Sequence, residues 1–287
     1  MHRKETLIDY HYRINNVINY INNHLGEELD IGKLAAVSNF SVYHFHRIMR
    51  AYLNEPLWTF IMRLRIENGA RLLQLTDEAV NEIAYKTGYE TPAAFSNAFR
   101  KRFGCTPVEY RNEKTIVMTI NYINEPQISI TMKNPKIKEV KSMKVIFIQS
   151  IGEYGKQEMK NSWEKLFSFI KKNKLFSFGM DCLGISYDDP SITEPSKCRY
   201  EACVKIKKEA TPEGEIGIKT IEGGKFAVFM HKGPYDKLGL IYNEIYRNWI
   251  PANKIEVRNE PPFEKYLNTP GRTKPENLKT EIYIPIV

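Results

Sequence analysis

Hydrophobic residues in the first third of the chain recur at helical spacing, and the pattern occurs twice. Residues 31–40 read Ile-Gly-Lys-Leu-Ala-Ala-Val-Ser-Asn-Phe and residues 80–89 read Val-Asn-Glu-Ile-Ala-Tyr-Lys-Thr-Gly-Tyr, an offset of 49 positions. Asn39 and Gly88 stand at the same place in the two copies, and both residue types tolerate a left-handed backbone. Each copy therefore predicts a helix, a tight turn and a second helix.

The segments that follow the two turns predict further helices. Ser41 can cap a helix over about 42–53, with Phe45 and Met49 facing inward. Between the copies, residues 56–73 begin with proline and keep apolar residues on one periodic face. This segment predicts one continuous helix that connects the two units. At about 1.5 Å per residue it forms a rod of roughly 26 Å.

Another repeat appears in the second half of the chain, where β-branched strands alternate with amphipathic helices. Gly-Glu-Tyr-Gly-Lys at 152–156 returns as Gly-Pro-Tyr-Asp-Lys at 233–237, 81 residues later, and the strand-like segment 199–206 returns at 279–286. Each half reads strand, helix, strand, strand. We expect the two halves to form an antiparallel sheet backed by two helices, with a ligand groove between them.

These patterns predict a multidomain chain, and its 287 residues are enough for two cores. An all-α domain over residues 8–111 holds two helix-turn-helix units, at about 31–52 and 79–102, joined by the connecting helix. A polar linker spans 112–135, and an α+β domain occupies 136–287.

Composition narrows the class of protein. The chain is 42% hydrophobic and 26% charged, and it contains neither a signal-peptide pattern nor an apolar run of the roughly 20 residues that span a membrane. This predicts a cytoplasmic protein without membrane partners. The cysteines form no C-x-x-C pair and lack histidines at zinc-finger spacing, so we expect reduced thiols, no metal and no cofactor. They are Cys105, Cys182, Cys198 and Cys203.

The net charge of +8 suggests a nucleic-acid partner, but its distribution does not carry that argument. Residues 1–111 contain 14 Lys and Arg against 12 Asp and Glu, an excess of only 14 − 12 = +2. A role in DNA binding must therefore rest on where particular basic residues lie.

Residues 8–111 resemble the DNA-binding domain of the AraC/XylS family of bacterial transcription regulators. The most specific part is 83–111, which matches the second helix-turn-helix of that family nearly position for position. The resemblance implies binding to double-stranded operator DNA at promoters, regulation in the direction of activation, and contact with RNA polymerase. The connecting helix would hold two recognition helices near one DNA turn, about 34 Å, apart.

In the family's pattern, the exposed face of the first recognition helix contacts bases. Arg47 is the candidate for guanine, because its planar fork can bond O6 and N7 together, while a phosphate contact is the alternative. His46 is either a base donor or a surface histidine, and Tyr43 is expected to contact a thymine methyl or the sugar backbone. The predicted contacts of this unit are Ser41, Val42, Tyr43, His46, Arg47 and Arg50.

The second recognition helix departs from the family's pattern, because Pro92 and Ala93 offer no side-chain donors. Base reading is then limited to Ser96 and Asn97. A basic cluster suits phosphate contacts, with a solvated charge run as the alternative. It consists of Arg100, Lys101 and Arg102.

Residues 136–287 resemble the gyrase-inhibitor-like (GyrI-like) effector-binding domain that is fused to AraC-type and multidrug-responsive regulators. The motifs are Gly-Pro-Tyr at 233–235 and Glu281 within Thr-Glu-Ile-Tyr-Ile-Pro-Ile. The resemblance implies a small amphipathic effector, and a pocket carboxylate at Glu281 with aromatic walls would favour a cation. Glu281 as an ordinary paired strand carboxylate, and the aromatic residues as core, are the alternatives. The predicted effector residues are Glu281, Tyr283, Tyr154, Trp163, Tyr187 and Tyr235.

Three functions compete for the C-terminal domain. In the first, effector binding changes DNA affinity or polymerase contact, which requires different effector affinities in two protein states. The second is a small-molecule hydrolase that uses a pocket Glu with Tyr. The chain shows no Ser-His-Asp or Cys-His constellation, so an enzyme is not expected. The third is a ligand-free module that contacts other proteins.

Overall fold

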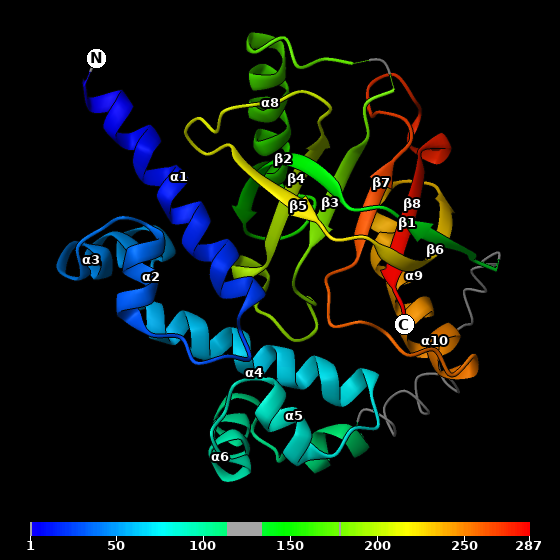
Figure 1. Cartoon of the computed structure of the whole chain (residues 1–287). Helices are drawn as coiled ribbons and strands as arrows, with labels where there is room; N and C mark the ends of the chain where they lie inside the picture. The colour runs from blue at the N-terminus through cyan, green and yellow to red at the C-terminus, as the bar shows by residue number, and fades with distance from the viewer. Residues whose placement is uncertain (1, 114–133, 178) are drawn as a thin grey trace. The chain divides into compact units, whose positions relative to one another are not determined.

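The chain divides into two compact units, Met1–Gln127 and Ile128–Val287, drawn from blue to red along the sequence in Figure 1. The computed structural model describes residues 2–113, 134–177 and 179–287. Most of the predicted linker, 112–135, lies outside these residues. In the described part of the chain, no helix is both long and apolar enough to span a membrane.

The first unit is helical, and its element order confirms the predicted pair of helix-turn-helix units with a connecting helix. Helices α2 and α3 form the first helix-turn-helix unit, α4 is the connecting helix, and α5 and α6 form the second helix-turn-helix unit (Figure 1). A further helical segment begins at Pro107 and continues to residue 113. The bounds are α1 His2–Asn23, α2 Ile31–Val37, α3 Val42–Leu53, α4 Leu57–Leu75, α5 Val80–Lys86 and α6 Pro92–Phe103.

The two turns use the same backbone chemistry. Asn39 has φ 51° and Gly88 has φ 83°, which confirms the left-handed turn positions. The residues before them, Ser38 and Thr87, each donate a side-chain hydroxyl to the carbonyls three and four residues earlier. These hydroxyls occupy carbonyls at the end of the helix that would otherwise lack donors.

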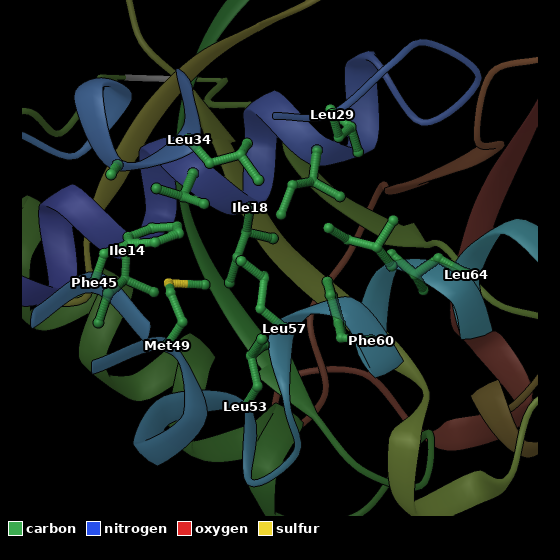
Figure 2. Packing of buried hydrophobic residues seen from close by; sticks show 14 residues of the cluster. Ile14, Ile18, Leu29, Leu34, Phe45, Met49, Leu53, Leu57, Phe60 and Leu64 are labelled. Atoms are coloured by element: carbon green, nitrogen blue, oxygen red, sulfur yellow. The ribbon is translucent and has the colours of Figure 1, made fainter. Parts of the chain in front are cut away.

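Side chains from four helices form the core of the first helix-turn-helix unit. The face of α1 packs against α2, α3 and the start of α4 around Phe45 and Met49, both fully buried. Figure 2 shows these side chains pointing toward one another, among them Ile14, Ile18, Leu34, Phe45, Met49, Leu57 and Phe60. This packing orients α3 so that its other face meets solvent.

Gly88 is expected to tolerate substitution worse than Gly104, although both have a left-handed backbone, at φ 83° and 78°. A Cβ on Gly88 would lie 2.7 Å from Cζ of Arg65, whereas nothing lies within 4 Å of one on Gly104. Gly104→Ala should cost about 1 kcal/mol of unfolding free energy, the usual left-handed penalty, and Gly88→Ala about 1–3 kcal/mol more because packing must shift. Urea unfolding of both variants measures the difference. Equal losses would show that Gly88 is needed only for its dihedral angle.

The second unit is one eight-stranded sheet with the strand order β1-β6-β8-β7-β3-β4-β2-β5, in which every neighbouring pair is antiparallel. Its helices are α8 Gln157–Lys172, α9 Leu238–Glu244 and α10 Ile250–Ala252, and a π-helical turn, Ile245–Trp249, joins the last two. The strands are β1 Lys136–Val140, β2 Met143–Ile151, β3 Cys182–Ser186, β4 Arg199–Lys205, β5 Gly217–Ile221, β6 Gly224–Lys232, β7 Phe263–Tyr266 and β8 Lys279–Pro285.

The predicted repeat is present as β2-α8-β3-β4 and β6-α9-β7-β8, and it is longer than the sequence indicated. Strand β1 precedes β2 but pairs with β6 of the other half, and β5 precedes β6 but pairs with β2. Each half therefore lends its first strand to the other, and β3 pairs with β7 at the centre.

Both faces of this sheet are buried. On one face, α8 covers β2 and β4 through Leu166 and Ile170, and α9 covers β6 and β8 through Leu238 and Ile241. The opposite face holds a separate core that includes Phe147. We call these the helix face and the opposite face.

Candidate nucleic-acid interface and effector site

Helix α3 presents most of its predicted DNA-contacting residues to solvent. Val42, His46, Arg47 and Arg50 are exposed, while Phe45 and Met49 on the other side are buried. Ser41 is exposed too, and its hydroxyl caps the helix by accepting a bond from the His44 amide at 3.4 Å. The Tyr43 side chain lies outside the described residues.

On α6, the predicted residues divide between solvent and the connecting helix. Asn97, Arg100 and Lys101 are exposed, and Ser96 is half-buried. The Nη2 atom of Arg102 lies 3.4 Å from a carboxylate oxygen of Glu67 on α4. Arg102 therefore helps to hold α6 against α4, although it is exposed to solvent like Arg100 and Lys101.

In the second unit, a buried carboxylate lies at the centre of the helix face. Glu264 on β7 pairs in register with Gly184 on β3. The two residues point to the same face of the sheet and are equivalent positions of the two halves, 80 residues apart (184 + 80 = 264). A Cβ on Gly184 would lie 2.7 Å from Oη of Tyr200 and closer still to Oη of Tyr266. Glycine in one half thus makes room for the polar groups around the glutamate of the other.

Aromatic side chains from both halves surround this carboxylate. Tyr266 and Tyr242 donate hydroxyl hydrogen bonds to its two oxygens, the second at 3.2 Å. The Tyr200 and Tyr266 hydroxyls are 3.2 Å apart, and Trp163 Nε1 donates to the Tyr200 hydroxyl at 3.2 Å. We call these five residues the Glu264 cluster. It links α8, three strand positions and α9 through one hydrogen-bonded chain.

The Glu264 cluster is poorly solvated and short of positive charge. Glu264 is 5% exposed, and burial raises its pKa even though hydrogen bonds from Tyr266 and Tyr242 oppose the shift. Among the described residues, no Lys, Arg or His forms an ion pair with it. Burial also raises the pKa of Tyr266 well above the ordinary tyrosine value. A cation that entered would meet a desolvated carboxylate between aromatic rings.

The six residues predicted to line one effector groove lie on two faces, which corrects that prediction. Trp163 belongs to the Glu264 cluster, the Tyr235 ring lies 5.2 Å from that of Tyr266, and the Tyr154 ring lies 6.5 Å from that of Tyr200. The other three belong to the opposite face. Because successive strand residues point to opposite faces, they cannot join the first three. They are Glu281, Tyr283 and Tyr187.

The negative charge of Glu281 is balanced by a lysine of the same domain. Lys138 on β1 donates to its carboxylate at 2.9 Å and Tyr283 at 2.8 Å. Although burial raises the pKa of Glu281, these two hydrogen bonds and the lysine charge bring it below the ordinary value. This is the paired strand carboxylate that stood as the alternative.

The repeat partner of Glu281 is neutralised in the same way. Glu201 is fully buried and pairs with Lys219 on β5, and Tyr187 donates to it at 3.0 Å. The lysines come from the two exchanged strands, at positions 81 residues apart (138 + 81 = 219). Both pairs are therefore a structural consequence of the strand exchange.

Sequence reasoning missed Glu264, Tyr266, Tyr242 and Tyr200. One signal was available, because aligning the halves at an offset of 80 sets Glu264 against Gly184. A charge and a glycine at equivalent strand positions indicate that the symmetry between the two halves is broken at this point of the sheet.

Two family models match the chain in the order of its two units. Residues 34–113 match a helix-turn-helix domain, and residues 133–287 match a GyrI-like small molecule binding domain. The protein is thus a DNA-binding transcription regulator with a small-molecule-binding domain. Since the second match covers more than half of the chain, the chain belongs to the GyrI-like family.

Relatives and solved structures match the chain over different lengths. The chain is 27% identical over 150 residues to the prophage-derived transcriptional regulator YosT of Bacillus subtilis, covering 52% of this chain and 97% of YosT. It is 30% identical over 105 residues to the probable transcriptional regulator YgiV of Escherichia coli, and the match covers 36% of this chain and 65% of YgiV.

Among solved structures, the EcmrR–DNA complex in EcmrR-RPo matches 89% of this chain and 98% of that one, with 16% identity and a TM-score of 0.45. A hydrolase from Listeria innocua matches 59% of this chain and 97% of its own, with 15% identity and a TM-score of 0.42.

Proposed function

We propose that this protein binds promoter DNA through α3 and α6, and that an amphipathic cation held beside Glu264 changes its DNA affinity or its contact with RNA polymerase. The observation that carries the proposal is the Glu264 carboxylate, which is 5% exposed and receives hydrogen bonds from two tyrosines. Since the DNA is its target, the protein acts in the cytoplasm.

The Glu264 cluster favours a cation for two physical reasons. A buried carboxylate without a positive partner is costly, and a bound cation would offset that cost directly. The faces of aromatic rings attract cations that have lost their water, by about 2 kcal/mol or more. Tyr235, whose pKa burial raises to about 12, lies next to Tyr266 and supplies another ring. An aromatic or lipophilic monocation meets both requirements.

On DNA, we propose unequal roles for the two recognition helices. The exposed face of α3 carries His46 and Arg47, which can donate to base edges in the major groove. The exposed face of α6 offers Asn97 for a base, with Arg100 and Lys101 for phosphates. Helix α3 then supplies most of the sequence selectivity.

A hydrolase is the second candidate, and the Tyr266–Glu264 hydrogen bond is the observation that favours it, because a hydroxyl next to a carboxylate can act as an activated nucleophile. The electrostatics oppose this role. Burial and the Glu264 charge raise the pKa of Tyr266 well above its ordinary value, so its hydroxyl is a poor nucleophile. We therefore propose that the protein is not an enzyme.

The test uses the full chain, an operator selected from random duplex DNA, and tetraphenylphosphonium as the probe cation. We expect saturable thermal stabilisation by the probe and a change in operator affinity of about 5–150-fold, the usual range of allosteric coupling. If operator affinity is unchanged, transcription assays with RNA polymerase test whether the cation changes the contact with the polymerase instead. Turnover of a p-nitrophenyl ester would instead support the hydrolase, and the absence of both binding and turnover would favour a protein-contact module.

A further inference from the structure

The middle of the connecting helix α4 buries three charged side chains. Arg65 is 6% exposed, and the side chains of Arg63 and Glu67 are 10% and 5% exposed. A charged side chain stays ionised inside a protein only when ion pairs or hydrogen bonds offset the cost of removing it from water. The bonds of these three residues reach segments of both helix-turn-helix units.

Arg65 joins the two helix-turn-helix units by donating hydrogen bonds to main-chain carbonyls. Its Nε and Nη2 donate to the carbonyls of Leu25 and Glu27, at 3.0 and 2.6 Å, in the loop that precedes α2. Its Nη1 donates to the carbonyl of Gly88 at 2.7 Å, in the turn that precedes α6. The planar guanidinium, which keeps these donors at fixed angles, therefore holds the two loops in one relative position.

Two glycines allow these loops to meet. A Cβ on Gly26 would lie 2.5 Å from the carbonyl oxygen of Lys86, so the loop before α2 touches the end of α5 directly. A Cβ on Gly88 would strike the Arg65 guanidinium. The contact between the two helix-turn-helix units therefore leaves no room for a side chain at either glycine.

Glu67 adds a second connection farther along α4. It pairs with Arg63, which also bonds Glu55 in the loop between α3 and α4 at 2.7 Å. The other carboxylate oxygen of Glu67 pairs with Arg102 near the end of α6. The polar joint formed by Arg63, Arg65 and Glu67 thus contacts the elements around both recognition helices.

We propose that this joint, and Arg65 above all, sets the spacing and rotational phase of the two DNA segments that the protein reads. Each base pair turns the duplex by about 35°, so a fixed angle between α3 and α6 accepts one separation of half-sites and rejects its neighbours. Arg65 is then a positioning residue that determines specificity without touching DNA. The inference rests on the proposed function in one respect, that both recognition helices contact DNA.

The experiment selects duplexes from a random library with the full chain and with Arg65→Met, and then measures affinity for the selected site with one base pair inserted between its halves. The wild type should enrich a strong half-motif read by α3 and a shorter one read by α6 through Asn97, at a single spacing, and lose at least about tenfold affinity on insertion. Arg65→Met should enrich the same half-motifs at several spacings and lose less than about threefold. The control is Ile61→Val, at a buried apolar position of α4 (1% exposed), which should keep the wild-type spacing.

Arg65→Lys provides a second variant if Arg65→Met does not fold, because lysine keeps the charge but lacks the planar fork. A variant that folds and keeps one spacing with the full insertion penalty overturns the inference while leaving DNA binding intact. A wild type that enriches a single half-motif overturns it as well. Failure of the wild type to enrich any sequence would instead contradict the proposed function.

Discussion

Replacing Glu264 with glutamine is expected to remove most of the affinity for tetraphenylphosphonium, while leaving the fold intact. The amide has nearly the same shape, and its oxygen can still accept a hydrogen bond from one of the two tyrosines that donate to Glu264 while its amino group donates to the hydroxyl oxygen of the other, but it carries no charge. Losing one partner of a buried charge pair costs about 2–5 kcal/mol, which corresponds to roughly a 30-fold or larger drop in affinity. Isothermal titration of the full chain measures this effect.

Glu281→Gln is the matched control, because it makes the same chemical change in the same sheet on the opposite face. Its carboxylate is already neutralised by Lys138, so we expect probe affinity within about twofold of wild type. If Glu281→Gln abolished binding and Glu264→Gln did not, the effector site would be on the opposite face and the assignment to the Glu264 cluster would be wrong.

The pH dependence of this site follows from the raised pKa of Glu264, caused by burial. Protons compete with the cation for the carboxylate, so probe affinity should fall as pH decreases through that raised pKa, beginning above the ordinary glutamate value of 4.5. Stability should change in the opposite sense. A carboxyl whose pKa is raised by folding stabilises the fold below its unfolded pKa and loses this contribution as pH rises through the folded one.

Glu264→Gln should therefore be at least as stable as wild type at neutral and alkaline pH, and its advantage should disappear in acid. Thermal unfolding across a pH series, with Glu281→Gln alongside, measures this. A wild-type advantage at alkaline pH would mean that the ionised carboxylate is better stabilised by its two tyrosines than its burial indicates.

Arg47→Ala should weaken binding to the selected operator much more than to scrambled DNA. An arginine that bonds one guanine with two hydrogen bonds contributes about 1–3 kcal/mol of discrimination, which is lost with the side chain. Lys101→Ala on α6 is expected to weaken both duplexes alike and to reduce the slope of log affinity against log salt by about 1. Titrations of both duplexes at several salt concentrations separate the two roles. Equal effects of the two substitutions on both DNAs would contradict the assignment of base reading to α3.

The helical unit could be predicted in detail because its determinants are local. A left-handed turn position favours asparagine or glycine, as at Asn39 and Gly88, and helical spacing identifies Phe45 and Met49 as inward residues. The joint on α4 was not predicted. In the sequence, Arg65 is a charged residue within a periodic helix, and its partners, Leu25 and Gly88, are separated from it by 40 and 23 residues.

The sequence by itself determined the two repeats, the order of α2 to α6 in the first unit, the strand, helix, strand, strand order in each half of the second unit and the α+β class of that unit. It did not indicate β1 and β5, the strands that the two halves exchange. It pointed to Glu281 and not to Glu264, although each of the two stands on a strand with a tyrosine two residues later. The surroundings of the two carboxylates differ in the tertiary structure. Strand exchange brings Lys138, 143 residues away in sequence, to Glu281, whereas Tyr242 on α9 and Tyr266 on β7 donate to Glu264, and no cation pairs with it among the described residues. The chemistry of a carboxylate depends on its solvation and its nearest charge, and long-range packing decides both.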